Sequence, residues 1–291
     1  MTKKIISFMN MKGGVGKTTL CVNIANTLAT HFDKKVLLID MDPQFNASQY
    51  ALRVIYGKEH TNVYDQHKKE GKTIFSIYKK IDNNQKEKED IQKSIFHTKS
   101  INDGHLRKNY SINLKENFDI ILGDIDLIEL QITQKSGIEQ VLEKYIELNE
   151  FKENYDYIFI DSPPTYSFFF ISSYRSCDTY ILPVKPDYLS ANGITLLGRA
   201  EDAIVETLGK KVNPLGIIYT LIDPRNSLHI PVQESIKKNI GSENIFKHGM
   251  RYLKKIPEGL DKQKFMLDIE DQDIAKDIRL ITEEFLTRIN K

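Results

Sequence analysis

A glycine-rich segment near the N-terminus carries lysine and threonine at the spacing used to bind phosphate. The segment reads Lys12-Gly13-Gly14-Val15-Gly16-Lys17-Thr18-Thr19. Its end fits the pattern G-x-x-x-x-G-K-[ST], although Met11 stands where the first glycine belongs. The glycines let backbone N–H groups approach phosphates closely. We expect Lys17 to reach the β- and γ-phosphates of ATP, Thr18 to bind Mg²⁺ and Thr19 to contact phosphate.

Three aspartates follow short apolar runs and have the chemistry needed beside such a loop. Asp40 and Asp42 come after residues 36–39, and Asp161 comes after residues 157–160. Ligands of doubly wound sheets lie at the carboxyl ends of strands, and a buried carboxylate needs a cation or a donor. We expect Asp161 to hold Mg²⁺ through water, Asp40 to support the metal site and Asp42 to orient the attacking water. Helix capping or turn formation is the alternative role for each.

These side chains need a sheet that brings strand ends together. Short apolar runs predict six buried strands, at residues 5–9, 36–39, 120–122, 157–160, 179–184 and 216–221. Helical patterns lie at residues 17–32, 137–148, 191–208 and 273–289. The alternation predicts an α/β fold with a doubly wound, mostly parallel sheet and helices on both faces. We expect residues 1–291 to form a single P-loop ATPase domain.

One region departs from this alternation. From about residue 57 to residue 117 the chain is rich in Lys, Asp, Asn and Gln. Residues 73–81 are predicted to form a short helix, and the rest, including residues 83–90, a solvated insertion. The insertion is either a partner-binding face or a loop without a function of its own.

Composition limits the possible functions. The formal net charge is +1, so the chain as a whole does not attract nucleic acid or membrane, although a local basic patch can. Cys21 and Cys177 form no CxxC pair, which argues against a disulfide framework and favours a reducing cytoplasm. Apolar runs are too short to span a bilayer. Because the first strand starts at Ile5, we expect no helix-turn-helix domain before it.

The motifs together resemble the ParA/MinD family of deviant Walker ATPases. The resemblance rests on the glycine-rich segment at 12–19, on Val36-Leu37-Leu38-Ile39-Asp40-Met41-Asp42-Pro43-Gln44 and on Tyr155-Asp156-Tyr157-Ile158-Phe159-Ile160-Asp161-Ser162-Pro163-Pro164. Within the family the chain is most similar to the ParA partition branch, through Asn46-Ala47-Ser48, Leu182-Pro183-Val184 and Thr220-Leu221-Ile222-Asp223-Pro224-Arg225. The resemblance covers residues 3–55 and 118–290.

The resemblance implies a role for several residues. Lys12 is the signature lysine, which in relatives crosses a dimer interface and touches the partner's ATP. Lys12, Lys17 and Asp42 would then be catalytic, with Asp42 as the water-activating aspartate. Arg225 and Arg251 fall where the partition branch carries arginines that hold DNA. The implied protein is cytoplasmic and nucleoid-associated, closes a dimer on Mg²⁺-ATP, binds DNA non-specifically and hydrolyses ATP when a ParB-type centromere-binding protein stimulates it.

Two other functions share these motifs. A MinD-like membrane switch needs a C-terminal amphipathic helix with a basic polar face. The stripe of the last helix (Ile274, Ile278, Ile281, Phe285 and Ile289) has acidic neighbours, so we expect it to pack on the domain and expect no membrane partner. A metabolic or electron-transfer relative, such as a nitrogenase iron protein or a dethiobiotin synthetase, is the second alternative. An iron–sulfur site needs ligating cysteines, and Cys21 is expected in the core, whereas Cys177 fits either role.

The sequence also indicates where the adenine would lie. We expect it beside the loop after residues 216–221 and beside residues 183–187, without assigning a single contact.

Overall fold

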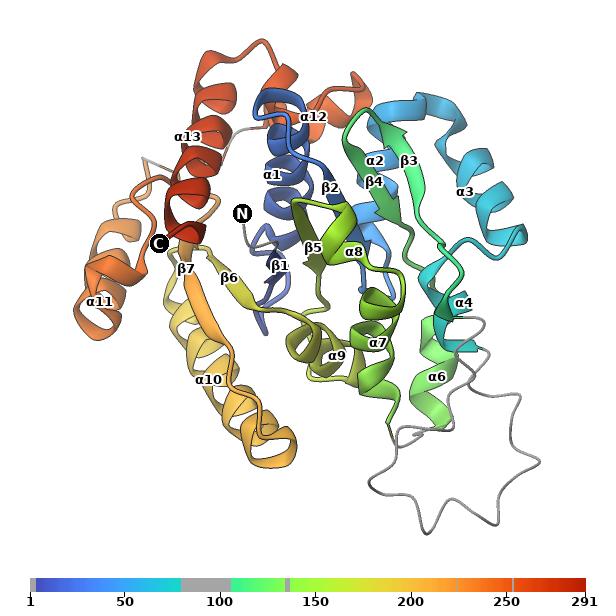
Figure 1. The fold of residues 1–291 in the computed structure, drawn as a ribbon. Coiled ribbons are helices and arrows are strands. Elements are labelled where there is room, and N and C mark those ends of the chain that lie inside the picture. Colours follow the sequence, from blue (N-terminus) through green and yellow to red (C-terminus); the bar gives the residue numbers. More distant parts are fainter. Residues whose placement is uncertain (1–3, 80–105, 134–136, 224, 253) are drawn as a thin grey trace.

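The computed structural model describes residues 4–79, 106–133, 137–223, 225–252 and 254–291 (Figure 1). Within these residues seven strands form one sheet in the order β3-β4-β2-β5-β1-β6-β7. The strands are β1 (Lys4–Phe8), β2 (Val36–Asp40), β3 (Ile112–Lys115), β4 (Phe118–Ile121), β5 (Tyr157–Asp161), β6 (Thr179–Val184) and β7 (Asn213–Tyr219). Every pairing is parallel except that of β3 with β4. The mostly parallel sheet is confirmed.

The register brings three strand ends to one level. Asp40 on β2 pairs with Asp161 on β5, and Asp161 also pairs with Phe8 on β1. The glycine-rich loop follows β1 directly, so the loop and the two aspartates meet at the carboxyl edge of the sheet. This is the edge at which ligands of such sheets lie.

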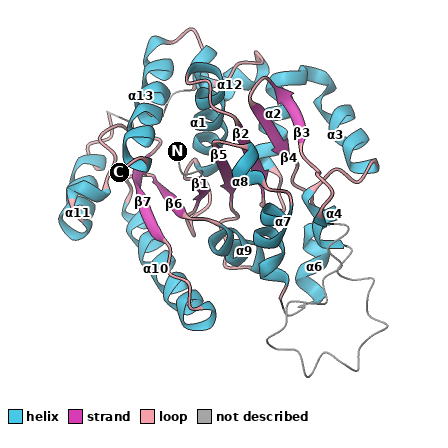
Figure 2. Cartoon of the chain, in the orientation of Figure 1, coloured by secondary structure: helices cyan, strands magenta, loops and turns pink. Residues whose placement is uncertain are grey.

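Helices cover both faces of the sheet (Figure 2). One face packs against α1 (Lys17–His31), α2 (Asn46–Tyr56), α3 (His60–Lys69), α12 (Lys255–Asp261) and α13 (Gln272–Ile289). The other packs against α4 (Ile74–Lys79), α6 (Leu127–Thr133), α7 (Val141–Leu148), α8 (Phe151–Asn154), α9 (Phe168–Ser176), α10 (Tyr188–Leu208) and α11 (His229–Ile240). Short 3₁₀ turns lie at Gly57–Glu59, Ile138–Gln140, Ser242–Asn244 and Met266–Asp268.

The six predicted strands and four predicted helices are all present. Strand β4 covers Phe118–Ile121 rather than residues 120–122, and β7 starts earlier than expected, at Asn213. Successive residues of β1 face opposite cores: Ile5 belongs to one and Ile6 to the other. Burial on both faces makes these strands read as continuous apolar runs, which is why their positions were predictable.

The prediction of a solvated insertion at residues 57–117 is wrong for both ends of that segment. Its first part forms α3, and its last part forms the edge strand β3. Ile112 on β3 is buried in the core, and Val63 and Tyr64 on α3 pack against the core. Few side chains of α3 and β3 face the core, so the polar composition hid both elements. The predicted helix at 73–81 contains α4, and residues 83–90 lie outside the described residues.

The C-terminal helix α13 packs its apolar stripe into the core, as predicted. Ile274, Ile278, Ile281, Phe285 and Ile289 are all buried. Phe285 meets the rings of Tyr157 and Phe159 edge-on. Among the described residues, no helix is both long enough and apolar enough to cross a bilayer.

Both cysteines are buried. Cys21 lies in α1, as expected for a core residue, and Cys177 lies between α9 and β6. Burial raises the pKa of the Cys177 thiol to about 12 and raises that of Cys21 well above its usual value. Both side chains therefore stay protonated thiols that pack in the core.

Candidate nucleotide-binding site

The glycine-rich loop joins β1 to α1 and has the backbone shape of a phosphate cradle. Gly14 and Gly16 have φ of 71° and 80°, a region that favours glycine. Helix α1 begins at Lys17 and has no side-chain cap, so its first N–H groups remain to bind an anion. Thr220, in the loop after β7, donates a 2.6 Å hydrogen bond to the carbonyl of Val15. The end of residues 216–221, which leads into the loop expected beside the adenine, is therefore in contact with the glycine-rich loop.

Lys17 is held inside this cradle. Its side chain is mostly buried, at 7% relative exposure, and its Nζ donates to the carbonyl of Lys12 at 3.2 Å. Burial lowers the pKa of Lys17, whereas the charges of Asp161 and Asp42 act in the opposite direction. The cation thus lies between the loop and two carboxylates, where a phosphate would supply further negative charge.

Thr18 and Asp161 form the pair expected for a magnesium site. The Thr18 hydroxyl donates to Asp161 Oδ2 at 2.7 Å, while Asp161 Oδ1 is buried without a hydrogen-bond partner. Burial raises the pKa of Asp161 to about 7, although Thr18 and Lys17 lower it. A buried carboxylate with an unsatisfied oxygen beside a hydroxyl fits a hard cation. Among the described residues, no three or more His, Cys, Asp or Glu side chains form a group that could hold a metal ion.

Asp40 and Asp42, the other two aspartates of the candidate site, differ in their contacts. Asp40 Oδ2 accepts from the backbone N–H and the hydroxyl of Ser48, at 2.8 and 2.7 Å. Burial and the charge of Asp161 raise the pKa of Asp40. Asp42 is also buried, and its Oδ1 accepts from the N–H of Gln44. Asp40 thus anchors α2 through Ser48, whereas the negative charge of Asp42 raises the pKa of Lys17.

Lys12 makes a contact that the sequence did not reveal. Its Nζ lies 2.7 Å from the carboxylate of Asp187, the residue before α10. Asn10 supports this arrangement, because it accepts from the N–H of Lys12 and donates to the carbonyl of Pro183. Asn10 was missed, and the only signal for it was a polar residue next to the glycine-rich loop. Asp187 ends the segment expected beside the adenine, but its contact with Lys12 was not expected.

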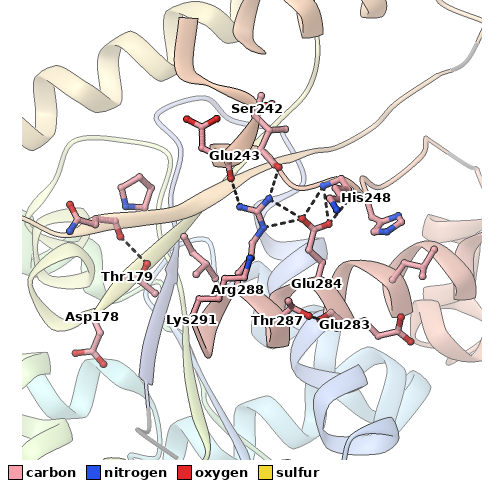
Figure 3. A pocket seen from close by; sticks show the side chains of 16 residues that line it. Asp178, Thr179, Ser242, Glu243, His248, Glu283, Glu284, Thr287, Arg288 and Lys291 are labelled. Carbon is pink, nitrogen blue, oxygen red and sulfur yellow. Dashed lines mark hydrogen bonds and ion pairs between the residues drawn. The ribbon is translucent and has the colours of Figure 1, made fainter. Parts of the chain in front are cut away.

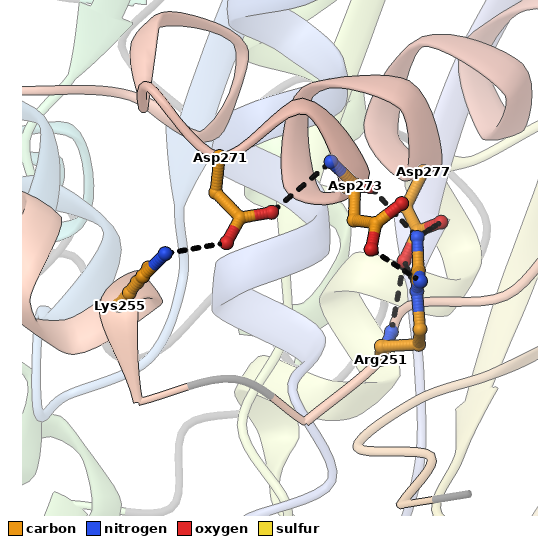
Figure 4. Close-up of polar contacts among 5 residues, drawn as sticks. All are labelled: Arg251, Lys255, Asp271, Asp273 and Asp277. Atoms are coloured by element: carbon orange, nitrogen blue, oxygen red, sulfur yellow. Dashed lines mark hydrogen bonds and ion pairs between the residues drawn. The ribbon is translucent and has the colours of Figure 1, made fainter.

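The two arginines expected to hold DNA are paired with carboxylates. Arg225 is 85% exposed and contacts Asp223, two residues away. Arg251 is 30% exposed and reaches Asp277 and Asp273 on α13 (Figure 4). Figure 4 also shows Lys255 bound to Asp271 nearby. Arg251 therefore belongs to a cluster with more acids than bases, which makes it a poor phosphate contact in this arrangement.

A large cleft lies at the other end of the sheet. It has a volume of about 920 Å³ and includes Thr179 and Asn213, which begin β6 and β7 (Figure 3). Arg288 lies in this cleft, pairs with Glu284 and donates to the carbonyls of Glu243 and Ile245. These contacts tie α13 to the segment after α11, which is a structural role.

A comparison with known families identifies the chain's relatives. The AAA_31 family, described as an AAA domain, matches residues 3–214, a span that includes the phosphate loop and all three aspartates. The chromosome partitioning protein ParA of Caulobacter vibrioides is 24% identical over 242 residues, which cover 82% of this chain and 78% of ParA. The chain belongs to the ParA/MinD family.

Other members of the ParA/MinD family agree with this assignment. The sporulation initiation inhibitor protein Soj of Bacillus subtilis is 29% identical over 235 residues, or 81% of this chain and 79% of Soj. A solved structure of a plasmid partition protein from Borrelia burgdorferi, bound to AMPPNP, has a TM-score of 0.70. It is 21% identical, and the match covers 99% of this chain and 100% of that protein. At this identity the structural match shows the shared fold.

Proposed function

We propose that this chain is a partition ATPase that binds and hydrolyses Mg²⁺-ATP at the glycine-rich loop. The observation that carries the proposal is the Thr18–Asp161 pair, with its 2.7 Å hydrogen bond and the unsatisfied Asp161 Oδ1. Thr18 and Asp161 would hold Mg²⁺, directly and through water. The metal would supply positive charge to the β- and γ-phosphate oxygens. The AMPPNP bound to the Borrelia relative supports the choice of ATP.

The other site residues divide the remaining tasks. Lys17 neutralises phosphate oxygens, and the N–H groups of Gly13 to Thr19 surround them. Asp42 orients the attacking water, and Asp40 keeps the loop that carries Asp42 in place through Ser48. Positioning and charge neutralisation are the main contributions that a protein makes to phosphoryl transfer.

Dimerisation would complete the site. Lys12 stands at the position of the family's signature lysine, and in a dimer it would reach the ATP of the second copy. Its contact with Asp187 would have to break for that movement. ATP binding would thus be coupled to the association of two chains, and hydrolysis to their release.

The dimer would bind DNA without sequence preference. Arg225 supports this role because its side chain is exposed, as are Lys237 and Lys238 at the end of α11. Arg251 would contribute only after leaving Asp273 and Asp277. A ParB-type centromere-binding protein would stimulate hydrolysis, in keeping with the partitioning names of the relatives. The cytoplasm, on the nucleoid, would be the place of action.

The decisive experiment measures binding to a non-specific DNA duplex by interferometry with ATP, with ADP and without nucleotide, each at two salt concentrations. Binding that requires ATP and is lost at high salt supports the partition function, because phosphate contacts release counterions. Absence of binding with ATP at low salt would refute the DNA-dependent part of the proposal. Phosphate release measured on the same protein tests the ATPase part separately.

A further inference from the structure

The turn that carries Asp42 holds a bulky residue in an unfavourable backbone conformation. Phe45, the residue before α2, has φ 43° and ψ 37°. This left-handed region disfavours side chains with a Cβ atom by about 1–2 kcal/mol. The N–H of Phe45 donates to the carbonyl of Asp42 at 2.8 Å, so the conformation of Phe45 is part of the Asp42 turn. Such a conformation persists only where surrounding contacts impose it.

The contact that imposes it comes from α3. The rings of Phe45 and Tyr64 are stacked, with centroids 4.9 Å apart and an interplanar angle of 11°. The Tyr64 hydroxyl donates to the carbonyl of Gly123 at 3.1 Å. Burial raises the pKa of Tyr64, so the phenol remains a donor at neutral pH. Tyr64 therefore joins the Asp42 turn to the segment after β4.

Gly123 is also linked to Asp40, one of the aspartates of the candidate site, through hydrogen bonds of Ser48. Its N–H donates to the hydroxyl of Ser48, which in turn donates to Asp40. A Cβ atom at Gly123 would lie 2.7 Å from the Cβ of Phe45 and 2.8 Å from the Cγ of Asp40. Phe45, Gly123 and Asp40 are thus packed without spare space.

Helix α3 is itself fixed to the same segment. Lys68, one turn after Tyr64, pairs with Asp124 at 2.7 Å and with Asp126 at 2.9 Å. The buried carboxylate of Asp124 also accepts from the hydroxyl of Thr73. The C-terminal end of α3 is thereby fixed to the same segment that accepts the hydrogen bond of Tyr64.

We propose that Tyr64 is a positioning residue for ATP hydrolysis, which holds the Asp42–Phe45 turn so that Asp42 faces the phosphate loop. The proposal rests on the proposed ATPase function. In this proposal α3 supports the candidate site, although α3 lies in the part of the chain where the sequence showed no family motif. Tyr64 acts through Phe45 and is not one of the residues proposed to bind ATP or the attacking water. Its loss should therefore impair turnover more than nucleotide binding.

The test compares Tyr64→Ala, Tyr64→Phe and Gln66→Ala by kcat at saturating Mg²⁺-ATP and by Kd for a non-hydrolysable ATP analogue. Tyr64→Ala is expected to lower kcat about tenfold and to leave Kd within about twofold, since a small misplacement of a catalytic group is costly. Tyr64→Phe keeps the stacked ring and should retain kcat within about threefold. Gln66 lies on the exposed side of α3, so its variant should match the unaltered protein.

A double variant examines the route through Phe45. Phe45→Ala should lower kcat about as much as Tyr64→Ala, and the two together should lower it no further, because residues that act through one contact are not additive. Thermal unfolding checks that each variant folds. Should Tyr64→Ala fail to fold, Tyr64→Leu, which fills the space without a stacking ring, takes its place.

Three results would overturn the proposal: an unchanged kcat in Tyr64→Ala, a loss of nucleotide affinity as large as the loss of kcat, or effects of Phe45→Ala and Tyr64→Ala that multiply. Hydrolysis by the unaltered protein is measured first. Its absence would refute the proposed function itself, and with it this inference, whereas normal hydrolysis in Tyr64→Ala would refute only the inference.

Discussion

The ammonium group of Lys12 lies 2.7 Å from a carboxylate oxygen of Asp187 in the same chain. The two residues are 175 positions apart, and their side chains are 25% and 29% exposed. In the proposed dimer, Lys12 would bind the ATP of a second copy of the chain, and it would first have to leave Asp187. The strength of this ion pair should therefore affect how readily the dimer forms.

Asp187→Asn should favour the ATP-bound dimer, because it removes the charge that holds Lys12. A partly exposed ion pair contributes about 0–1 kcal/mol, so the protein concentration at half-dimerisation should fall by up to about fivefold. Analytical ultracentrifugation with a non-hydrolysable ATP analogue measures this. Asp261→Asn, which removes an exposed partner of Arg53, serves as the control. A variant that no longer dimerises would mean that Asp187 supports the closed dimer instead.

Lys17→Ala should abolish ATP hydrolysis. Lys17 is buried in the glycine-rich loop, and in the proposed function its charge neutralises phosphate oxygens. Loss of one preorganised charge in a phosphoryl-transfer site lowers kcat by at least about 100-fold. Phosphate release under saturating Mg²⁺-ATP is the assay, with the exposed Lys58→Ala as the control. Activity of Lys17→Ala within tenfold of the unaltered protein would place catalysis elsewhere.

Arg225→Ala should weaken DNA binding evenly across sequences. Each phosphate contact contributes about one unit to the slope of log affinity against log salt concentration, so the variant should lose about one unit of slope. Interferometry on two duplexes of unrelated sequence over a salt series gives both quantities. An unchanged slope would show that Arg225 touches no phosphate.

Release of Arg251 should strengthen DNA binding. Replacement of Asp273 and Asp277 by asparagine removes two negative charges and frees the guanidinium group, which should raise affinity at low salt by several-fold. Addition of Arg251→Ala to that double variant should remove most of the gain. If the gain persists in the triple variant, it comes from the altered charge of α13 and not from Arg251.

Much of the candidate site was predictable from the sequence, because its residues follow strands that are buried on both faces. Lys17 and Thr18 begin α1, after the loop that follows β1, and Asp161 ends β5. Parallel strands expose their carboxyl ends along one edge, so the position of each residue along its strand was enough to bring them together. Their expected meeting is seen in the Thr18–Asp161 hydrogen bond.

Other relationships were decided only by the tertiary structure. Strand β3 and helix α3 were missed because each buries few side chains, which leaves little periodic signal. The partners of Lys12, Phe45 and Arg251 could not be inferred either. Periodicity in a sequence reports which side chains are buried, whereas the contacts of these three depend on how loops and helix ends approach one another across the fold. The sequence by itself thus determined the six parallel strands, the glycine-rich loop and the carboxylates beside it, and the packing of distant segments decided which charged groups and rings contact them.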